Sequence, residues 1–211
     1  MGHASDPADL ALHGVRVLGF PTTARIAARF GLDRDAVEED LLDAEARGWV
    51  RTLTFGATSG WSLTDAGRTE GERRLAAELA LTGSRAAVTS VHARFLPLNR
   101  RFGVACTDWQ VRPTRLDPMA LNDHTDWRWD ERVLRTLASL ERAFRDLCDE
   151  LAALLTRFDG YGDRFASAVR EVQAGRRAWL DAPDRDSCSL LWIQFHEDLL
   201  ATLGIPRGSD A

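Results

Sequence analysis

The chain has 211 residues, enough for one large domain or two small ones. Hydrophobic residues make up 45% of it and charged residues 28%, which excludes wholesale disorder. The net charge is −5, from 27 basic and 32 acidic residues, and all of the basic ones are arginine. No apolar run approaches the roughly 18 residues that span a bilayer. The start MGHASDPADL has no signal-peptide pattern, so we expect a cytoplasmic protein without a membrane partner.

Three cysteines, Cys106, Cys148 and Cys188, are spread through the second half of the chain. Their number is odd and no two share CxxC spacing, so the sequence predicts neither a disulfide framework nor a zinc site. We expect thiols that pack as small apolar side chains, and no metal or cofactor.

The first 48 residues predict three short helices. Apolar residues from Leu10 to Leu18 indicate the first, which ends near Gly19. Thr22 or Thr23 can cap the second through a side-chain oxygen, and Gly31 suits its carboxyl end. Asp33 caps the third, and Gly48 ends it. The apolar stripe of this third helix consists of Val37, Leu41, Leu42 and Ala44.

A hairpin and a long helix are expected next. Trp49–Phe55 alternates in polarity as a half-buried strand does, GATSG makes a turn, and Trp61–Thr64 returns as the partner strand. Asp65 then caps a helix that runs to about Leu81. Each expected element is consistent with its neighbours, which supports the assignment.

The second half of the chain predicts a helical bundle. Residues 86–104 look helical until Pro97 interrupts them, and an irregular segment follows over 107–130. Apolar residues then recur at intervals of three and four from Val133 to Phe158. Further helices are expected over about 163–181 and 186–203. The sequence thus predicts a mainly α protein with two domains, 1–83 and 84–211.

Charge is distributed unevenly along the chain. Residues 33–47 hold seven acids and two arginines, a net charge of −5 (2 − 7). The acids are Asp33, Asp35, Glu38, Glu39, Asp40, Asp43 and Glu45. Residues 85–115 hold six arginines and one acid, a net charge of +5 (6 − 1). A polyanionic partner would be repelled by the first segment and attracted by the second.

Residues 9–82 resemble the winged helix-turn-helix domains of bacterial transcriptional regulators of the MarR and PadR kind. The resemblance is carried by ARFGLDRDAV, EARGWVR and WSLTDAGR. The second half resembles a module of actinobacterial regulator-like proteins, some associated with phosphoenolpyruvate-utilising, dikinase-like enzymes. The segments that carry this second resemblance are FLPLNRRF, CTDWQVRP, NDHTDW and FHEDLLATLG.

The first resemblance implies that the third helix enters the major groove of DNA and that the hairpin is a wing. The DNA-contacting residues it implies are Thr22, Thr23, Arg25, Arg34, Arg51, Thr58 and Ser59. Among them, Arg34 would pair with N7 and O6 of a guanine. Asp35, Glu38 and Glu39 would face the same groove, and their charge opposes binding. A winged helix used only for protein contact or packing is therefore the alternative.

Residues 108–130 gather three tryptophans around His124. An ordered loop that caps the bundle is one interpretation, and a small-ligand pocket is another. The residues of that pocket would be Trp109, His124, Asp126, Trp127, Trp129, His196, Arg100 and Arg101. No second histidine lies at ligand spacing from His124, so the sequence predicts no metal site. His196, at the edge of an apolar helix face, is either structural or part of the pocket.

We expect no enzyme and no catalytic residues, because the chain has no phosphate-binding glycine loop, GxSxG or HExxH motif. The first hypothesis is a dimeric regulator that binds double-stranded DNA and a small-molecule effector. The helix over 133–158 would supply its dimer interface, or would pack within the bundle. The second hypothesis is an accessory module for protein or ligand binding that does not bind DNA. A remote third is an enzyme acting on an anionic substrate.

Overall fold

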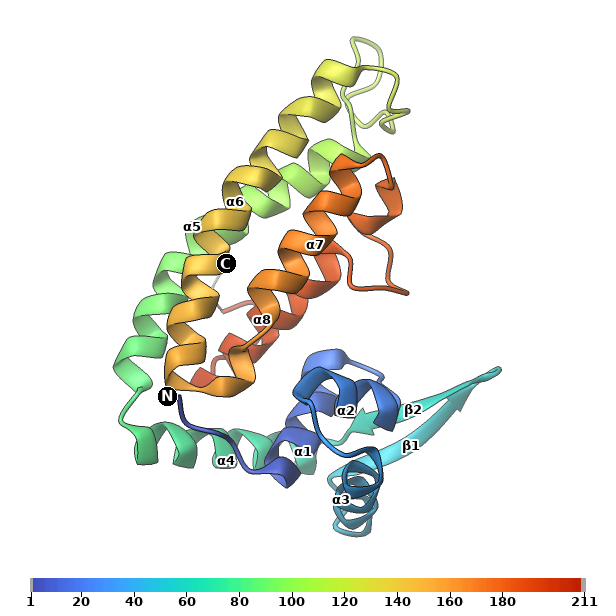
Figure 1. Cartoon of the computed structure of the whole chain (residues 1–211). Coiled ribbons are helices and arrows are strands. Elements are labelled where there is room, and N and C mark those ends of the chain that lie inside the picture. Colours follow the sequence, from blue (N-terminus) through green and yellow to red (C-terminus); the bar gives the residue numbers. More distant parts are fainter. Residues whose placement is uncertain (1, 210–211) are drawn as a thin grey trace. The chain divides into compact units, whose positions relative to one another are not determined.

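The computed structural model describes residues 2–209. It is mainly α, with eight α-helices, two 3-10 helices and a two-stranded antiparallel sheet in this range, as Figure 1 shows. The chain divides into two compact units. The first consists of residues 1–88, 152–157 and 194–211, and the second of residues 89–151 and 158–193. Within the described range, no helix is both long and apolar enough to cross a membrane.

The three short amino-terminal helices are confirmed: α1 (Pro7–Leu18), α2 (Thr23–Phe30) and α3 (Arg34–Ala46). Thr22 caps α2 by accepting from the amide of Arg25, and Asp33 caps α3 by accepting from Asp35 and Ala36. Gly31 ends α2 with a φ of 66°, which a residue with a Cβ adopts at a cost. Leu42 was expected in the buried stripe of α3 but is 51% exposed, because the buried face follows Val37, Leu41 and Ala44 alone.

A hairpin follows, formed by β1 (Val50–Phe55) and β2 (Thr58–Leu63). The register pairs Val50 with Leu63 and Phe55 with Thr58, which leaves Gly56 and Ala57 as the turn. The expectation of a five-residue turn was therefore wrong, since residues 58–60 lie in the ladder. The expected alternation of burial in the first strand was also wrong, because only Val50 of β1 is buried. The rest of the strand extends beyond the core (Figure 1).

The long helix α4 (Asp65–Thr82) ends at Gly83. Its amino-terminal cap is Thr64 and not Asp65, since the Thr64 hydroxyl accepts from the amide of Gly67 at 3.0 Å. Residues near the amino terminus pair with the segment after residue 153: His3 donates to the carbonyl of Leu154, and its own carbonyl accepts from Thr156. These bonds join the first stretch of the first unit to its middle stretch, residues 152–157.

Helix α5 (Arg85–Gln110) is continuous through Pro97, so the expected interruption was wrong. Proline in a helix removes one hydrogen bond and crowds the preceding turn. Here Phe95 and Phe102, on either side of it, are both buried, and their packing outweighs that local cost. The irregular segment is correspondingly shorter than expected and ends where α6 (Trp127–Leu154) begins.

The second unit also contains α7 (Tyr161–Gln173) and the 3-10 helix η2 (Arg177–Trp179), while another, η1 (Thr156–Phe158), follows α6. The helix expected over 163–181 is thus shorter and ends at Gln173. The last helix, α8 (Cys188–Leu203), has Leu191 and Phe195 buried, whereas Ile193 is 57% exposed.

The core of the second unit is aromatic. The Trp192 ring stacks on Phe102 and Phe144, with ring centroids 4.3 and 4.8 Å apart. Phe165 contacts the same indole, and the indole N–H donates to Asn99 at 2.8 Å. The heptad positions of α6, from Val133 to Leu151, are buried inside this single chain. The stripe therefore serves intramolecular packing.

Candidate functional site

A groove lies between α2, α3 and the hairpin. It is lined by Thr22, Thr23, Ala24, Arg34, Glu38, Leu42, Thr52, Ser59, Gly60 and Trp61. Four of the seven residues expected to contact DNA line it: Thr22, Thr23, Arg34 and Ser59. The structure thus brings the start of α2, the start of α3 and the second strand to one surface.

Trp61 anchors the floor of this groove. Its indole N–H donates to the Thr23 hydroxyl at 2.9 Å, and that hydroxyl donates to the carboxylate of Glu38. Thr23 is 6% exposed, so its side chain is not available to a phosphate. The Glu38 carboxylate, in turn, accepts a bond from within the fold. Glu38, one of the three acids expected to oppose DNA binding, is therefore partly engaged in a hydrogen bond within the first unit.

The three arginines expected to contact DNA differ in their relation to the groove, since Arg34 alone of them is among its lining residues. Within residues 2–209, the guanidiniums of Arg25, Arg34 and Arg51 form no ion pair. Arg34 and Arg51 are exposed and Arg25 is half-buried. Thr58 is exposed on β2, and Ser59 exchanges a hydrogen bond with Thr54 across the ladder at 2.9 Å. Arg34 is therefore an unneutralised positive charge in the groove, while Arg25 and Arg51 follow and precede the lining residues Ala24 and Thr52 in sequence.

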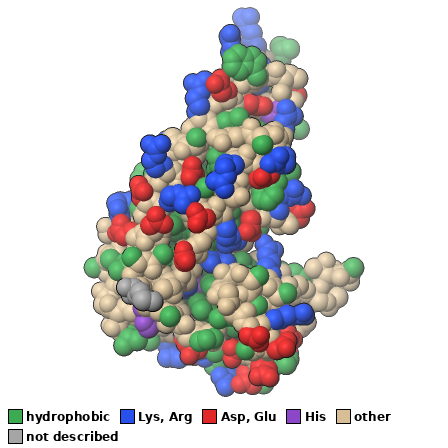
Figure 2. All heavy atoms as spheres, viewed as in Figure 1, with side chains coloured by type: hydrophobic (Ala, Val, Ile, Leu, Met, Phe, Trp, Pro, Cys, Tyr) green, Lys and Arg blue, Asp and Glu red, His purple; other side chains and the backbone are tan. Residues whose placement is uncertain are grey.

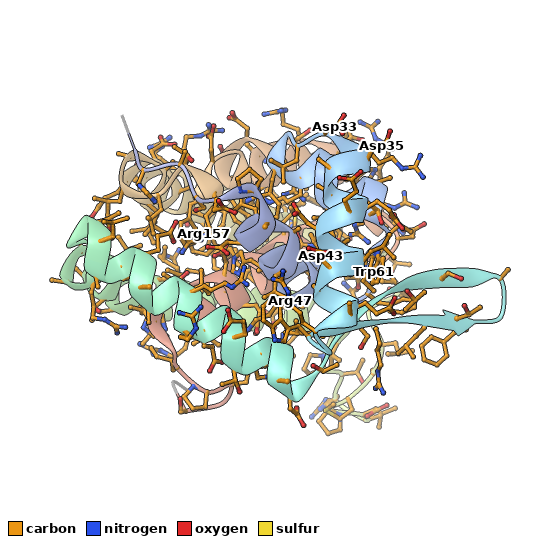
Figure 3. The ribbon with its side chains drawn as sticks, turned by 90° about the horizontal axis from the view of Figure 1, so that it is seen from below. Asp33, Asp35, Asp43, Arg47, Trp61 and Arg157 are labelled. Carbon is orange, nitrogen blue, oxygen red and sulfur yellow. The ribbon has the colours of Figure 1, made fainter. Side chains whose placement is uncertain are left out.

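The exposed side of α3 is acidic. Figure 3 shows Asp33, Asp35 and Asp43 along the helix and Arg47 at its end, and Figure 2 shows acidic side chains gathered over it. Arg47 reaches Asp43 at 3.5 Å, an exposed pair of little energetic value. Burial, followed by repulsion from Asp6, Asp43 and Glu39, raises the pKa of Asp40. The surface of α3 thus repels anions.

Most of the basic segment 85–115 is already neutralised or bonded. Arg94 pairs with Glu150 at 2.6 Å, and Arg112 pairs with Asp126 at 3.1 Å. Arg101 donates to the Ser139 hydroxyl, and Arg85 donates to the carbonyl of Leu203. Within residues 2–209, Arg100 and Arg115 alone of the six have no side-chain partner. The net charge of this segment therefore overstates its attraction for a polyanion.

The tryptophan-rich segment forms a folded loop. His124, with a left-handed φ of 58°, donates from Nδ1 to the Asp130 carboxylate at 3.0 Å and packs on Trp109. The Asn122 amide donates to Asp130 and to the carbonyl of Trp109, while Trp129 donates to the carbonyl of Asp108. The expected pocket residues Trp109, His124 and Trp129 are therefore structural partners of this loop.

The other expected pocket residues are held in different ways, and Asp126 accepts a capping bond from the amide of Trp129. Asp126 pairs with Arg112, Trp127 is 65% exposed, and His196 belongs to the first unit. Among the described residues, no three histidine, cysteine, aspartate or glutamate side chains converge as metal ligands. All three cysteines are free thiols, and burial raises the pKa of Cys106 and, to about 12, that of Cys188.

Sequence reasoning missed a buried polar cluster in the first unit. Arg157, with a fully buried side chain, pairs with Glu78 and lies 3.6 Å from Asp198. Asp198 accepts from His13 at 2.9 Å, and the Arg157 carbonyl accepts from Arg29. Burial alone would raise the pKa of Asp198, but His13 and the two guanidiniums lower it overall. The only signal in the sequence was the presence of charged residues within apolar helix faces.

A second group of ion pairs is centred on Glu197, the residue that precedes Asp198. Arg16 bonds both Glu72 and Glu197 at 2.8 Å, and Arg207 also bonds Glu197. Burial raises the pKa of Glu197, but these two arginines lower it overall. Helices α1, α4 and α8 are thereby tied together by charge.

Comparison with models of protein families, with curated proteins and with solved structures found no match for this chain.

Proposed function

We propose that residues 7–82 act as a winged helix-turn-helix domain and that the protein is a transcriptional regulator that binds double-stranded DNA. The observation that carries this proposal is Arg34, an exposed arginine in the groove lining that forms no ion pair within residues 2–209, with the likewise unpaired Arg25 and Arg51 on the adjoining α2 and β1. Elsewhere in the first unit, arginines such as Arg16, Arg74 and Arg157 each bond to carboxylates. Guanidiniums without a carboxylate partner remain available to phosphates or to base edges.

In this proposal one arginine reads a base and the other two contact the phosphate backbone. Arg34, at the first position of α3, would read a guanine by a bidentate bond, because its exposed guanidinium can approach the base edge. Arg25 and Arg51 would contact phosphates on either side, together with the Thr22 hydroxyl. The protein would bind as a homodimer on a palindromic site, through a surface other than the buried stripe of α6.

The acidic face of α3 supports a second candidate function. Within residues 2–209, Asp35 and Glu39 form no ion pair and Asp43 pairs with the exposed Arg47, so this face would favour a basic protein partner over DNA. Under this alternative the domain is an accessory module that binds a protein. The two candidates make opposite predictions for the removal of negative charge from α3.

The test is a titration with the duplex upstream of the protein's own coding region and with unrelated duplex, at about 50 and 200 mM salt. We expect preference for the first duplex and weaker binding at high salt. Arg34→Ala should lower specific affinity by about 1–3 kcal/mol and leave the unrelated duplex little affected. Arg135→Ala, which removes an exposed arginine of the second unit, is the matched control.

Glu39→Gln separates the two candidates. If α3 approaches DNA, loss of this exposed carboxylate should strengthen binding to both duplexes, because it removes a repulsion from phosphates. Equal, weak binding of both duplexes by the wild type at about 50 mM salt would refute the regulator and leave the accessory module.

A further inference from the structure

The tip of the hairpin carries an exposed aromatic side chain that the contacts proposed above do not use. Phe55, the last residue of β1, is 68% exposed. Gly56 and Ala57 form the turn beside it, and Thr58 pairs with it across the ladder. The sequence has no charged residue from Thr52 to Thr64. The tip is therefore slim and uncharged, and Phe55 is the one large apolar side chain exposed in residues 50–63.

A second aromatic residue orients the Phe55 ring. Phe20, between α1 and α2, packs on β2 at Gly60, where an added Cβ would lie 3.1 Å from the Phe20 ring. The rings of Phe20 and Phe55 meet edge to face, with centroids 5.5 Å apart and an angle of 63° between their planes. This contact restricts the Phe55 side chain but leaves most of it open to solvent. Little conformational freedom then remains to be lost when Phe55 binds a partner.

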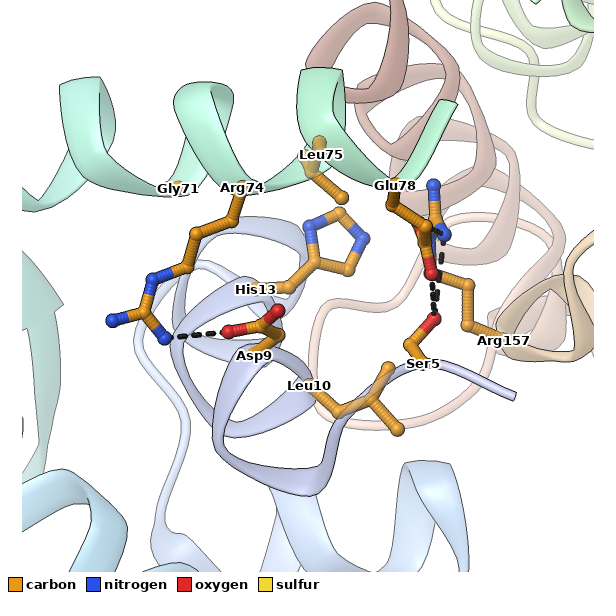
Figure 4. A pocket seen from close by; sticks show the side chains of 9 residues that line it. All are labelled: Ser5, Asp9, Leu10, His13, Gly71, Arg74, Leu75, Glu78 and Arg157. Atoms are coloured by element: carbon orange, nitrogen blue, oxygen red, sulfur yellow. Dashed lines mark hydrogen bonds and ion pairs between the residues drawn. The ribbon is translucent and has the colours of Figure 1, made fainter. Parts of the chain in front are cut away.

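Phe55 shares one face of the hairpin with Arg51, because side chains alternate along a strand and the two residues are four positions apart. The Arg51 guanidinium is exposed and forms no ion pair within residues 2–209. Arg74 of the same unit, in contrast, bonds to Asp9, as Figure 4 shows. This face of the hairpin thus presents an unneutralised cation near the core and an aromatic ring at the tip. Nucleic acid matches both, through its phosphates and the flat faces of its bases.

The reach of the hairpin matches the spacing of the grooves of DNA. Phe55 lies five residues beyond Val50, the buried residue of β1, and five residues of strand span about 17 Å. One turn of the duplex is roughly 34 Å long, so neighbouring major and minor grooves are about 17 Å apart. Figures 1 and 3 show the hairpin projecting beyond the short helices of the first unit. With α3 in the major groove, as the proposed function requires, the tip would reach the neighbouring minor groove, whose width of about 6 Å admits small turn residues.

We propose that Phe55 enters the minor groove and wedges between two stacked base pairs, so that the bound duplex is bent. This inference rests on the proposed function and adds a second element of specificity to that of Arg34. Apolar wedges in the minor groove unstack one base step and kink the duplex by about 20–90°. Pyrimidine–purine steps such as TA and CA unstack most easily. The preferred site would therefore carry such a step about five base pairs, or half a turn, from the guanine that Arg34 contacts.

The first test measures bending. The duplex upstream of the protein's own coding region carries a donor dye at one end and an acceptor dye at the other, so that bending raises the energy transfer between them. We expect the transfer to rise when the wild type binds and to stay unchanged when Phe55→Ala binds. Phe55→Leu should keep part of the rise, because leucine also acts as a wedge. Phe55→Ala should lower the affinity for this duplex at least about fivefold, the loss expected for one base–aromatic contact.

Leu81→Ala is the matched control. It removes another exposed apolar side chain of the first unit, on α4, and should leave both bending and affinity unchanged. A straight duplex in the wild-type complex, or a bend that Phe55→Ala retains, would overturn the wedge while DNA binding stands. Equal, weak binding of this duplex and an unrelated one would refute the regulator, and the wedge with it. The failure of the wedge alone is thus distinguishable from the failure of the proposed function.

A second test locates the opened base step. The adenine analogue 2-aminopurine replaces each adenine of the duplex in turn, and its fluorescence rises where a base loses its stacking neighbour. We expect one bright position, about half a turn from the guanine that Arg34 contacts, with the wild type and with Leu81→Ala but not with Phe55→Ala. Because Phe55 is exposed, its truncation should leave the fold intact, which thermal unfolding checks. Equal fluorescence at all adenines in the wild-type complex would contradict the proposal.

Discussion

The two units of this chain are stabilised by different kinds of interaction. The first unit joins three separate stretches of sequence through buried, directional ion pairs centred on Arg157 and Asp198. The second packs the Trp192 indole among phenylalanine rings, with one hydrogen bond from the indole to Asn99. Removing one member of an ion-pair cluster leaves its partners buried and charged, whereas removing an apolar side chain leaves a void. The same degree of burial therefore predicts different responses to mutation and to pH in the two units.

In the first unit, we expect the largest loss of stability from the substitution Arg157→Met. It leaves Glu78 and Asp198 without their guanidinium, so we expect a loss of about 3–5 kcal/mol in the free energy of unfolding. Urea denaturation measures it. Arg176→Met removes an exposed arginine that pairs with Glu171 and should change stability by less than about 1 kcal/mol. Similar small losses in both variants would mean that the buried cluster contributes little.

Leu140→Ala makes the corresponding change in the second unit. Leu140 is fully buried on α6, and its truncation should cost about 2–5 kcal/mol. Because no titrating group is removed, the loss should be the same at pH 7 and pH 5. A loss that varied strongly between these pH values would show that the two units are not distinguished as we describe.

Acid should affect the first unit selectively. The folded pKa values of Asp198 and Glu197 are lowered, so their stabilising contribution is present above the unfolded values of about 3.9 and 4.3. It is lost as the pH falls through the folded values. Below pH 4, amide exchange of α1 should therefore rise more than that of α6. Asp198→Asn should reduce this difference, and an unaltered difference would contradict the assignment.

The smallest expected loss of stability comes from removing a helix cap. Asp33→Ala removes the side-chain oxygen that caps α3, and we expect a loss of about 1 kcal/mol. Asp33→Asn keeps a capping oxygen and should lose little, while it also removes one negative charge. Thermal unfolding of both variants separates the cap from the charge. Equal losses would attribute the effect to charge.

Local chemistry explains which parts of the fold could be predicted. The caps at Thr22 and Asp33 and the stop at Gly31 involve residues within three or four positions of one another, so the sequence indicates them directly. Pro97 shows the limit of local rules, because burial of the neighbouring phenylalanines outweighs the cost of proline in a helix. The predicted turn of the hairpin was too long, because the length of the turn is set by the pairing between the two strands.

The candidate sites depend on more distant contacts. The sequence indicated that Arg34 and Ser59 could share a surface, and the groove contains both. It could not indicate that Asp198 would bond to His13, which is 185 positions away. The same reasoning overestimated the free charge of residues 85–115, since the partners of Arg94 and Arg112 are remote or lie in an irregular loop. Pairing across such separations has no periodic signature.

Gly67 fixes the geometry of the hairpin in a way that turn residues do not. A Cβ at this position would lie 1.9 Å from the carbonyl oxygen of Trp49, where no real side chain fits. The first turn of α4 therefore rests directly on the backbone that enters β1. Any protein engineer who wishes to re-aim the hairpin should alter this contact, because exchanging the exposed residues of the turn would leave its angle to α4 unchanged.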